Sequence, residues 1–321
     1  MDNLTHTLAG LMLARVGLEK TTPRGTAMLM LAANAPDLDA VVWFRGTLPY
    51  IEFHRTYTHS LVFLPLMALL PMLIVRAKWS WRSYLASIAG VLSHLLLDWT
   101  NAYGIPLLYP LSARRFSLDI TNIFDLWIWV ILLGAVAATA LVGLVNGEIG
   151  AAKNTGARRG WAWAALGLLL AYEAARVVIH ERAVAVISAR LYEGAPPRRV
   201  MALPNATNPF TWRGVIWGPG FVVIAPVDLL GEYDPMTGPG AGRLYRIAAP
   251  VREMDVVLRT PPFQVFTHWS QAPFWKVTPV EDGLRLDLID LRFGTPDRPG
   301  FTHVSAFIDR AGNVLRAGFG I

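Results

Sequence analysis

The sequence contains no cysteine. Disulfides and thiolate metal sites are therefore excluded, and any metal ion must be held by histidine, aspartate or glutamate. Charge is scarce as well, because only 16% of the 321 residues are charged, whereas a soluble domain carries about 25%. Hydrophobic residues make up 54% of the chain and the mean hydropathy is +0.39. These values exclude an ordinary soluble domain and favour a membrane protein.

Several common functional patterns are also missing. The sequence has no P-loop, no GxSxG motif, no dinucleotide-binding fingerprint and no internal repeat. The net charge of +6 is modest, and no basic stripe is interleaved with aromatic residues, so we expect no nucleic-acid partner. The N-terminal stretch MDNLTHTLAG lacks a basic region and a small-residue cleavage site, so we do not expect it to be a cleaved signal peptide.

Long apolar runs fill the first 180 residues. A membrane-spanning helix needs about 20 apolar residues, and four runs approach or reach that length: 60–75, 83–97, 124–145 and 161–179. Two shorter runs, 4–18 and 26–35, are re-entrant or pack inside the bundle. The sequence therefore predicts a mainly α, polytopic membrane helical bundle over residues 1–180.

Basic residues between these runs predict the orientation of the chain. Three links are basic: the first carries Lys20 and Arg24, the second Arg76, Lys78 and Arg82, and the third Lys153, Arg158 and Arg159. The positive-inside rule places such links in the cytoplasm. With six segments, the N-terminus and residues 181–321 then lie outside an inner (cell) membrane that the chain crosses several times. Arg114 and Arg115 fall in an outer loop, where an anionic ligand would explain them.

Residues 181–321 are richer in proline, arginine and aspartate than the first half. From residue 197 onward, short runs such as GVIWGPGFVVIAPV and LRLDLIDLRF are typical of β-strands. The turn Asp-Arg-Ala-Gly-Asn in HVSAFIDRAGNVL predicts a hairpin. We therefore expect residues 181–321 to form a small, mostly antiparallel, β-rich extramembrane domain.

On this topology, histidines and aspartates collect at the outer membrane face. The chain returns to that face five times and places a histidine or an aspartate there at each visit. Ionisable groups at or within a membrane are costly and are usually functional. The candidate metal ligands are His6, Asp37, Asp39, His54, His59, His94, Asp98, Asp119 and Asp125.

Spacing favours some of these ligands over others. His94 and Asp98 are four residues apart, so on a helix both side chains project from one face, as two ligands of one cation would. Their alternative is an interhelical hydrogen bond. Asp37 and Asp39 follow Pro36, and in an extended segment both would point the same way, although PDLD also suits a plain turn.

The other candidates carry alternatives of similar weight. His54 and His59 are five residues apart and need a turn across residues 56–58 to meet. Asp119 and Asp125 precede a predicted helix, where an aspartate is equally typical of an N-cap. His6 suits a surface position as well as a ligand position. Histidine with aspartate, and no cysteine, favours Zn, Mn or Fe over Ca or Mg.

Four blocks resemble a known family. NLTHTLAG, APDLD, HRTYTHSL and SHLLLDWTNAYG are similar to the signature blocks of the YdjM-type membrane-bound, metal-dependent hydrolases, in the order THxxxG, PDxD, HRxxTHS and HxxxDxxxxxG. The resemblance covers about residues 1–145. A more distant similarity connects His94 and Asp98 with the zinc-dependent phospholipase C and P1-type nuclease pattern. The resemblance implies a hydrolase with a cluster of metal ions.

These observations lead to a mechanistic hypothesis. Two or three divalent ions, zinc in the first place, would activate water, and Arg55, Arg114 and Arg115 would grip phosphate oxygens through their planar guanidinium groups. Asp39 or Asp98 would act as general base if it is not a ligand. A site at the membrane surface implies a lipid or lipid-linked phosphoester as substrate. Two alternatives remain, an ion-coupled transporter and a non-catalytic scaffold with a structural metal whose C-terminal domain binds a partner.

Overall fold

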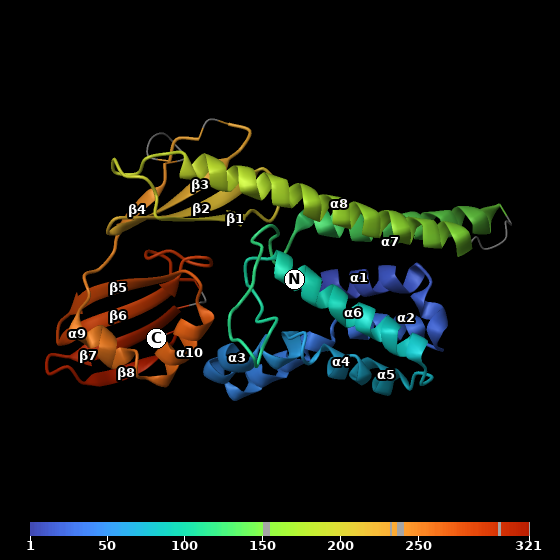
Figure 1. Ribbon diagram of the computed structural model, residues 1–321, viewed down its shortest axis with the longest axis horizontal. Helices are drawn as coiled ribbons and strands as arrows, with labels where there is room; N and C mark the ends of the chain where they lie inside the picture. The colour runs from blue at the N-terminus through green and yellow to red at the C-terminus, as the bar shows by residue number, and fades with distance from the viewer. Residues whose placement is uncertain (150–154, 232, 236–240, 301–302, 321) are drawn as a thin grey trace. The chain divides into compact units, whose positions relative to one another are not determined.

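The computed structural model describes residues 1–149, 155–231, 233–235, 241–300 and 303–320 (Figure 1). The chain divides into two compact units. The helical unit comprises Met1–Asp39, Arg55–Ile179 and Pro204–Pro209, and the sheet unit comprises Ala40–His54, His180–Leu203 and Phe210–Ile321. The division does not follow chain order, because a segment of fifteen residues near the N-terminus, 40–54, belongs to the sheet unit.

The helical unit is built from helices of very different length. Its α-helices are α1 (Asn3–Arg15), α2 (Gly25–Ala32), α4 (Leu64–Met67), α5 (Leu69–Val75), α6 (Trp81–Thr100), α7 (Leu126–Glu148) and most of α8 (Thr155–Ser188). Short 3₁₀ helices join them: η1 (Leu18–Thr21), η2 (Ala35–Arg45, which continues into the sheet unit) and η3 (Tyr57–His59).

Side-chain caps fix where three of these helices begin. The Asp2 carboxylate accepts a hydrogen bond from the Thr5 backbone N–H at the start of α1. The Ser80 hydroxyl accepts one from the Ser83 N–H at the start of α6. Asp125 accepts from two backbone N–H groups in the first turn of α7. Each cap satisfies donors that a helix start leaves without partners.

Three apolar clusters lie among the described residues of this unit, and two of them surround α1 and α2. One lies between α1, α7 and α8 and contains Leu8, Met12, Ile128 and Leu132. In Figure 1, α7 and α8 run side by side next to α1. The other core joins α2 to α5 and α6, and its centre is Met28 and Leu29 on α2. The short helix α2 therefore packs against both α1 and α6.

Two helices are long and apolar enough to cross a membrane, Leu126–Glu148 and Gly156–Ser188. The first contains the predicted run 124–145 from residue 126 onward, and the second contains the run 161–179. Two bent pairs, Gly25–Ala32 with Ala35–Arg45 and Thr47–His59 with Leu64–Val75, raise the number to four if each pair is one broken span. The alternative for each pair is a re-entrant loop. The described residues therefore contain two to four candidate spans, and the six-segment bundle stays a prediction.

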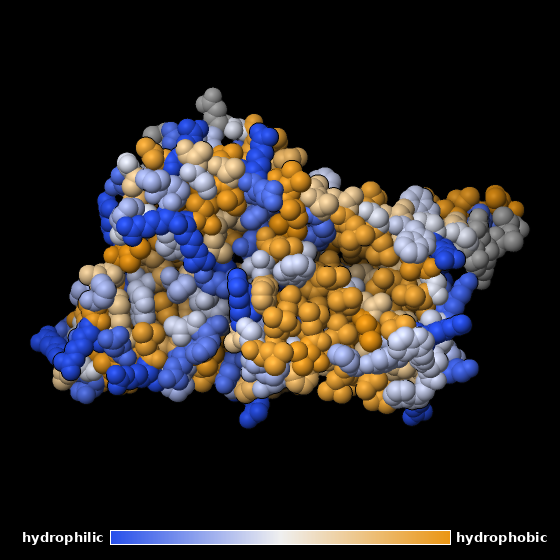
Figure 2. Space-filling model, in the orientation of Figure 1, coloured by the Kyte–Doolittle hydropathy of each residue, from blue (hydrophilic) through white to orange (hydrophobic). Residues whose placement is uncertain are grey.

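Helix α6 contains the predicted run 83–97 but is not among these candidates, because polar residues interrupt it. Its outer face is nevertheless apolar, since Leu85, Leu92 and Leu96 are all exposed. Figure 2 shows a continuous apolar surface over this part of the helical unit. The opposite face of α6 buries Gly90, His94 and Asp98. The helix therefore directs its polar residues inward and its leucines outward, as a membrane environment requires.

The described residues of the sheet unit form two four-stranded antiparallel sheets, in the orders β1-β2-β3-β4 and β5-β6-β7-β8. The strands of the first are β1 (Arg199–Pro204), β2 (Thr211–Gly218), β3 (Phe221–Asp228) and β4 (Arg243–Arg246). Those of the second are β5 (Pro273–Val280), β6 (Gly283–Asp290), β7 (His303–Asp309) and β8 (Val314–Phe319). The expected antiparallel β-rich C-terminal region is confirmed, with two sheets rather than one.

Short helices complete the sheet unit: α3 (Thr47–Phe53), α9 (Arg252–Val257) and α10 (Pro261–Trp269). Helix α10 packs against β7, β8 and α3. The predicted hairpin joins β7 to β8, and the Asp309 carboxylate accepts hydrogen bonds from the backbone N–H groups of Ala311 and Asn313 in its turn. The Asp309 side chain therefore stabilises the turn through its own backbone, as aspartate commonly does in turns.

One buried ion pair stabilises the second sheet. The Arg292 guanidinium donates to both oxygens of Asp290, and both side chains are fully buried. Ser270 and the Gln271 N–H also donate to Asp290. Burial alone would raise the pKa of Asp290, but the Arg292 charge and these hydrogen bonds outweigh it and lower the pKa. The pair is a fully satisfied structural element.

Candidate metal centre

Four side chains from three segments of the helical unit converge on one point. Asp37 comes from η2, His59 ends η3, and His94 and Asp98 lie one turn apart on α6. Each offers one nitrogen or oxygen atom, and these four atoms all lie within 4.8 Å of one another. His59, His94 and Asp98 are fully buried, and Asp37 is mostly buried.

The distances between these atoms suit ligands of one ion. The His94 Nε2 atom lies 3.1 Å from the His59 Nε2 atom. The His59 Nε2 atom is 3.4 Å from both Asp37 Oδ1 and Asp98 Oδ2. The His94 Nε2 atom is 3.8 Å from Asp37 Oδ1 and 3.6 Å from Asp98 Oδ2. Ligands about 2.0–2.1 Å from a tetrahedral zinc ion would lie about 3.3 Å apart.

The donor set also fits a cation chemically. Within the described residues, Asp37 Oδ1 and Asp98 Oδ2 are buried and have no hydrogen-bond partner. Buried polar atoms of this kind are rare and costly. Two neutral imidazoles that share a contact through their Nε2 atoms can form at most one hydrogen bond there. A divalent ion would satisfy both nitrogens and both oxygens at once.

Backbone and side-chain contacts orient the two imidazoles. The His94 Nδ1 atom lies 2.8 Å from the carbonyl oxygen of Ala33, to which it donates, so that Nε2 faces the cluster. The Thr58 hydroxyl donates to Asp39 Oδ2 at 2.5 Å and lies 3.0 Å from His59 Nδ1. Asp39 therefore supports His59 from behind, through Thr58. Such outer contacts fix the tautomer of a metal-binding histidine.

Two close helix contacts set the position of α2 and the site residues around it. A Cβ atom on Gly10 of α1 would lie 2.6 Å from the Leu29 carbonyl oxygen of α2. A Cβ atom on Gly90 of α6 would lie 2.6 Å from the Ala32 Cβ. Glycine at both positions therefore lets α2 approach α1 and α6. The approach brings the Ala33 carbonyl within reach of His94.

Arg55 is a buried cation at the edge of the cluster. Its Nη1 atom lies 3.1 Å from Asp98 Oδ2, and its backbone N–H donates to Asp39. Its Cζ atom stands 4.5 Å from the centre of the Tyr103 ring. The backbone φ of Arg55 is +58°, a left-handed conformation that is uncommon for arginine. This conformation and the Asp39 contact hold the guanidinium beside the carboxylates.

His6 lies directly against the cluster. Its ring stacks on that of His94 with 3.7 Å between centroids, and its Nε2 atom is 3.5 Å from Asp98 Oδ1. The amino group of Met1 contacts the same Asp98 oxygen. Both ring nitrogens of His6 are buried and have no hydrogen-bond partner in the described part of the chain. His6 is therefore placed to extend the ligand set next to Asp98.

Besides His6, Asp39 and Arg55, five further predicted site residues lie outside the four-residue cluster. His54 belongs to the sheet unit, where its ring stacks on Tyr50. Asp125 caps α7 and accepts a hydrogen bond from the Tyr172 hydroxyl. Asp119 has a positive φ of 55°. Arg114 is exposed and lies over the Phe116 ring, and Arg115 donates to the Gly104 carbonyl. Their proposed roles in binding metal or phosphate stay predictions.

Sequence reasoning missed several contacts at the site. The Ala33 carbonyl and the Gly90 contact are backbone features of apolar helices, for which the sequence carries no signal. Tyr103 follows Asp98 in the block SHLLLDWTNAYG, and Thr58 directly precedes His59, so proximity to recognised ligands could have indicated both.

The comparison with known families agrees with this geometry. A model of the YdjM inner membrane protein family matches residues 1–183, which is more than half of the chain. The chain belongs to the YdjM inner membrane protein family. All four cluster residues of this YdjM protein lie inside the matched range, and so do both long candidate spans except for the last turns of α8. The family resemblance noted in the sequence is confirmed.

A curated relative is similar to part of the chain. The uncharacterized protein YfhP of Bacillus subtilis (strain 168) is 29% identical over 154 residues, which cover 43% of this chain. The aligned segment spans 46% of YfhP, so the chain covers about half the length of this relative. No solved structure matches the chain.

Proposed function

We propose that this YdjM-family protein is a membrane-bound, metal-dependent hydrolase that cleaves a phosphoester in a lipid or lipid-linked substrate. The observation that carries the proposal is the convergence of Asp37, His59, His94 and Asp98, whose ligand atoms lie 3.1–3.8 Å apart in five pairs. A bound zinc ion supplies a Lewis acid that polarises a phosphoryl oxygen and lowers the pKa of water to about 7. Manganese and iron suit the same ligands.

The protein groups around the cluster have distinct roles in this proposal. The two imidazoles would hold the ion through Nε2, and the Asp37 and Asp98 carboxylates would offset its charge. Arg55 binds phosphate oxygens, and the support for this is that its Nε atom is buried without a hydrogen-bond partner among the described residues, while its Nη1 atom lies 3.1 Å from Asp98 Oδ2 at the edge of the cluster. Asp39, held by Thr58 and by the Arg55 N–H, receives the proton of the attacking water.

The surroundings of the cluster support a substrate that lives in the membrane. The segments that carry it belong to an inner membrane protein family. The outward face of α6, which holds two of the ligands, is lined with exposed leucines. A phospholipid or an isoprenoid phosphate would present its ester bond at the surface of the bilayer.

Metal analysis of purified protein tests the proposal. His94→Ala and Asp98→Ala should each reduce bound metal at least about tenfold, because each removes one of four ligands. His268→Ala is the matched control, since His268 is exposed on α10 of the sheet unit and should leave metal content unchanged. A panel of phosphoesters that includes phospholipids should show turnover that falls with metal content. Unchanged metal in both ligand variants would overturn the proposal.

One observation favours the transporter alternative. Asp37 lies just after the bend between α2 and η2, and His59 lies just before the bend that precedes α4. Broken helices that hold a cation are typical of ion-coupled transporters. Uptake of metal or protons into proteoliposomes, without phosphoester turnover, would select this alternative.

The number of ligands favours the scaffold alternative. Structural zinc sites are closed by four protein ligands, whereas catalytic sites keep one position open. Four ligands converge here, so a site without turnover and with firmly bound metal would be structural. Metal-dependent cleavage of any member of the phosphoester panel, abolished in His94→Ala, would exclude it.

A further inference from the structure

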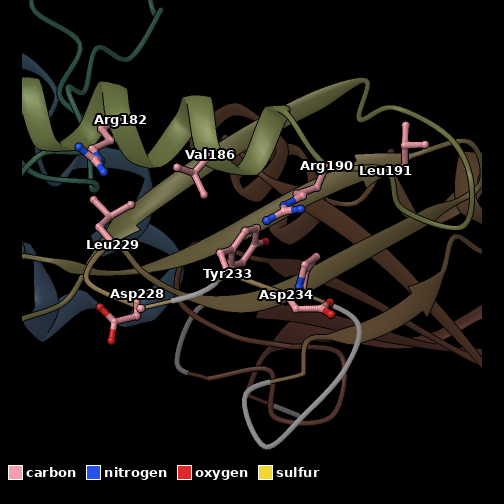
Figure 3. Close-up of a pocket in the computed structure, with 10 residues that line it drawn as sticks. Arg182, Val186, Arg190, Leu191, Asp228, Leu229, Tyr233 and Asp234 are labelled. Atoms are coloured by element: carbon pink, nitrogen blue, oxygen red, sulfur yellow. The ribbon is translucent and has the colours of Figure 1, made fainter.

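A second site lies in the sheet unit. A cavity of about 840 Å³ opens between the C-terminal turns of α8 and the segment that follows β3 (Figure 3). Cavities of about 300–1,000 Å³ are typical of small-molecule sites. None of its lining residues belongs to the metal cluster. Its chemistry is therefore independent of the proposed hydrolysis.

One wall of the cavity is cationic. Arg182, Val186 and Arg190 line it, and their spacing of four residues places them along one side of α8 and the turn after it. Both arginines are exposed, and neither has an ion-pair partner in the described part of the chain. In Figure 3 the Arg190 side chain is directed toward Tyr233. Two exposed guanidinium groups on one wall suit an anion such as phosphate.

The other wall carries carboxylates. Asp228, the last residue of β3, and Asp234 both line the cavity from the segment opposite α8. The Asp228 Oδ1 atom accepts a hydrogen bond from the Leu230 N–H. The Tyr233 hydroxyl lies 3.1 Å from the Tyr192 hydroxyl, and both rings are buried. This contact holds Tyr233 in place between the two aspartates along the chain. The cavity is therefore lined by arginines on one wall and carboxylates on the other.

The position of the cavity along α8 indicates where its ligand resides. The apolar run of α8 ends at residue 179, and Arg182 follows about 4.5 Å further along the helix axis. The headgroup layer of a bilayer extends about 5–8 Å beyond the hydrocarbon core. If α8 crosses the membrane along this run, Arg182 lies at the level of lipid phosphates. Leu191 and Leu229 add apolar lining for the adjoining part of a lipid.

We propose that this cavity binds the headgroup of a zwitterionic phospholipid that carries a primary amine. Arg182 and Arg190 bind the phosphate oxygens, and the Asp228 carboxylate binds the ammonium group, with Asp234 adding negative charge to that wall. The site anchors a lipid at the point where α8 leaves the membrane and enters the sheet unit.

Binding to the full-length protein in detergent tests the proposal. The probes are short-chain phosphatidylethanolamine, phosphatidylglycerol and soluble phosphoethanolamine, each titrated by calorimetry. The variants are the double substitution Arg182→Gln with Arg190→Gln, the single substitution Asp228→Asn, and the control Arg252→Gln. Arg252 is an exposed arginine of α9 that does not line the cavity. A His94→Ala background, with metal content measured in parallel, separates this site from the metal cluster.

The expected pattern distinguishes the two walls. The double arginine variant should weaken both lipids at least about tenfold, because it removes the charge-assisted hydrogen bonds to phosphate. Asp228→Asn should weaken phosphatidylethanolamine about three- to tenfold and leave phosphatidylglycerol unchanged. Arg252→Gln should bind as the wild type does, and in the His94→Ala background the double arginine variant should still weaken both lipids by the same factor. Wild-type affinity in the double variant would overturn the proposal, and so would equal affinity for soluble phosphoethanolamine, which would make the cavity a site for a free metabolite.

Discussion

The two units of the molecule bury carboxylates in opposite ways. In the sheet unit, Asp290 is completely buried, and both of its oxygens accept hydrogen bonds, mostly from Arg292 two residues away. In the helical unit, Asp98 is also completely buried, but its Oδ2 atom accepts no hydrogen bond within the described residues. The Asp37 Oδ1 atom beside it is also buried and accepts no hydrogen bond among the described residues.

This difference separates structure from function. A buried charge that serves only the fold is neutralised by a close partner, because an unpaired charge in the interior costs several kcal/mol. In the helical unit, Arg55 and the Met1 amino group lie close to Asp98, but Asp37 Oδ1 and Asp98 Oδ2, which face the two imidazoles, accept no hydrogen bond among the described residues. A bound cation would give these atoms a partner, which is why the comparison favours a metal site in one unit and a structural ion pair in the other.

The largest effect should come from breaking the satisfied pair. Asp290→Ala leaves Arg292 buried without its counter-ion, and it should lower the stability of the second sheet by about 3–5 kcal/mol. Hydrogen exchange of the full chain in detergent, followed by mass spectrometry, measures this in peptides from β5–β8. The matched control is Asp282→Ala in the exposed turn between β5 and β6, which should change exchange little. Unchanged protection in Asp290→Ala would show that the pair does not stabilise the sheet.

Removal of metal should have the next largest effect, and in the other unit. An ion that binds only the folded state stabilises it by about 4 kcal/mol when present at a thousandfold excess over its Kd. Chelation should therefore speed hydrogen exchange in α2 and α6 and leave β5–β8 unchanged. The same experiment on His94→Ala is the control, because chelation should add nothing there. Equal loss of protection in both units would contradict a metal site that belongs to the helical unit alone.

The sequence anticipated the local parts of this arrangement. Four-residue spacing indicated that His94 and Asp98 share one side of a helix, and the turn before Asn313 predicted the β7–β8 hairpin. Both predictions depend only on residues that are close together in the sequence. The family blocks then associated these residues with Asp37 and His59.

The non-local parts could not be read in this way. Residues 40–54 belong to the sheet unit because α3 contacts α10 and β8, which lie more than 200 residues further along the chain. The tautomer of His94 depends on a backbone carbonyl, and every residue has one. An extended segment would point Asp37 and Asp39 the same way, but both residues lie in a 3₁₀ helix, and only Asp37 joins the four-residue cluster. Pro36 is the second residue of η2, a position that proline tolerates at a helix start, so it does not begin an extended segment.

The smallest effect should come from one methyl group between α6 and α2. Gly90→Ala would place a Cβ atom 2.6 Å from the Ala32 Cβ and 3.3 Å from the Leu29 carbonyl oxygen, so α6 must shift away from α2. Such overpacking costs about 1–3 kcal/mol. Because His94 lies one turn further along α6 and donates to the Ala33 carbonyl at 2.8 Å, the shift should also weaken metal binding.

Thermal unfolding and metal titration of purified protein measure both effects of Gly90→Ala. The matched control is Gly134→Ala in α7, where a Cβ atom meets nothing within 4 Å. That control should gain about 0.5–1 kcal/mol from the higher helix propensity of alanine and keep its metal affinity. If Gly90→Ala also kept wild-type metal affinity, the α2–α6 contact would stabilise the helices without positioning His94, and the donor geometry would depend on η2 and η3 instead.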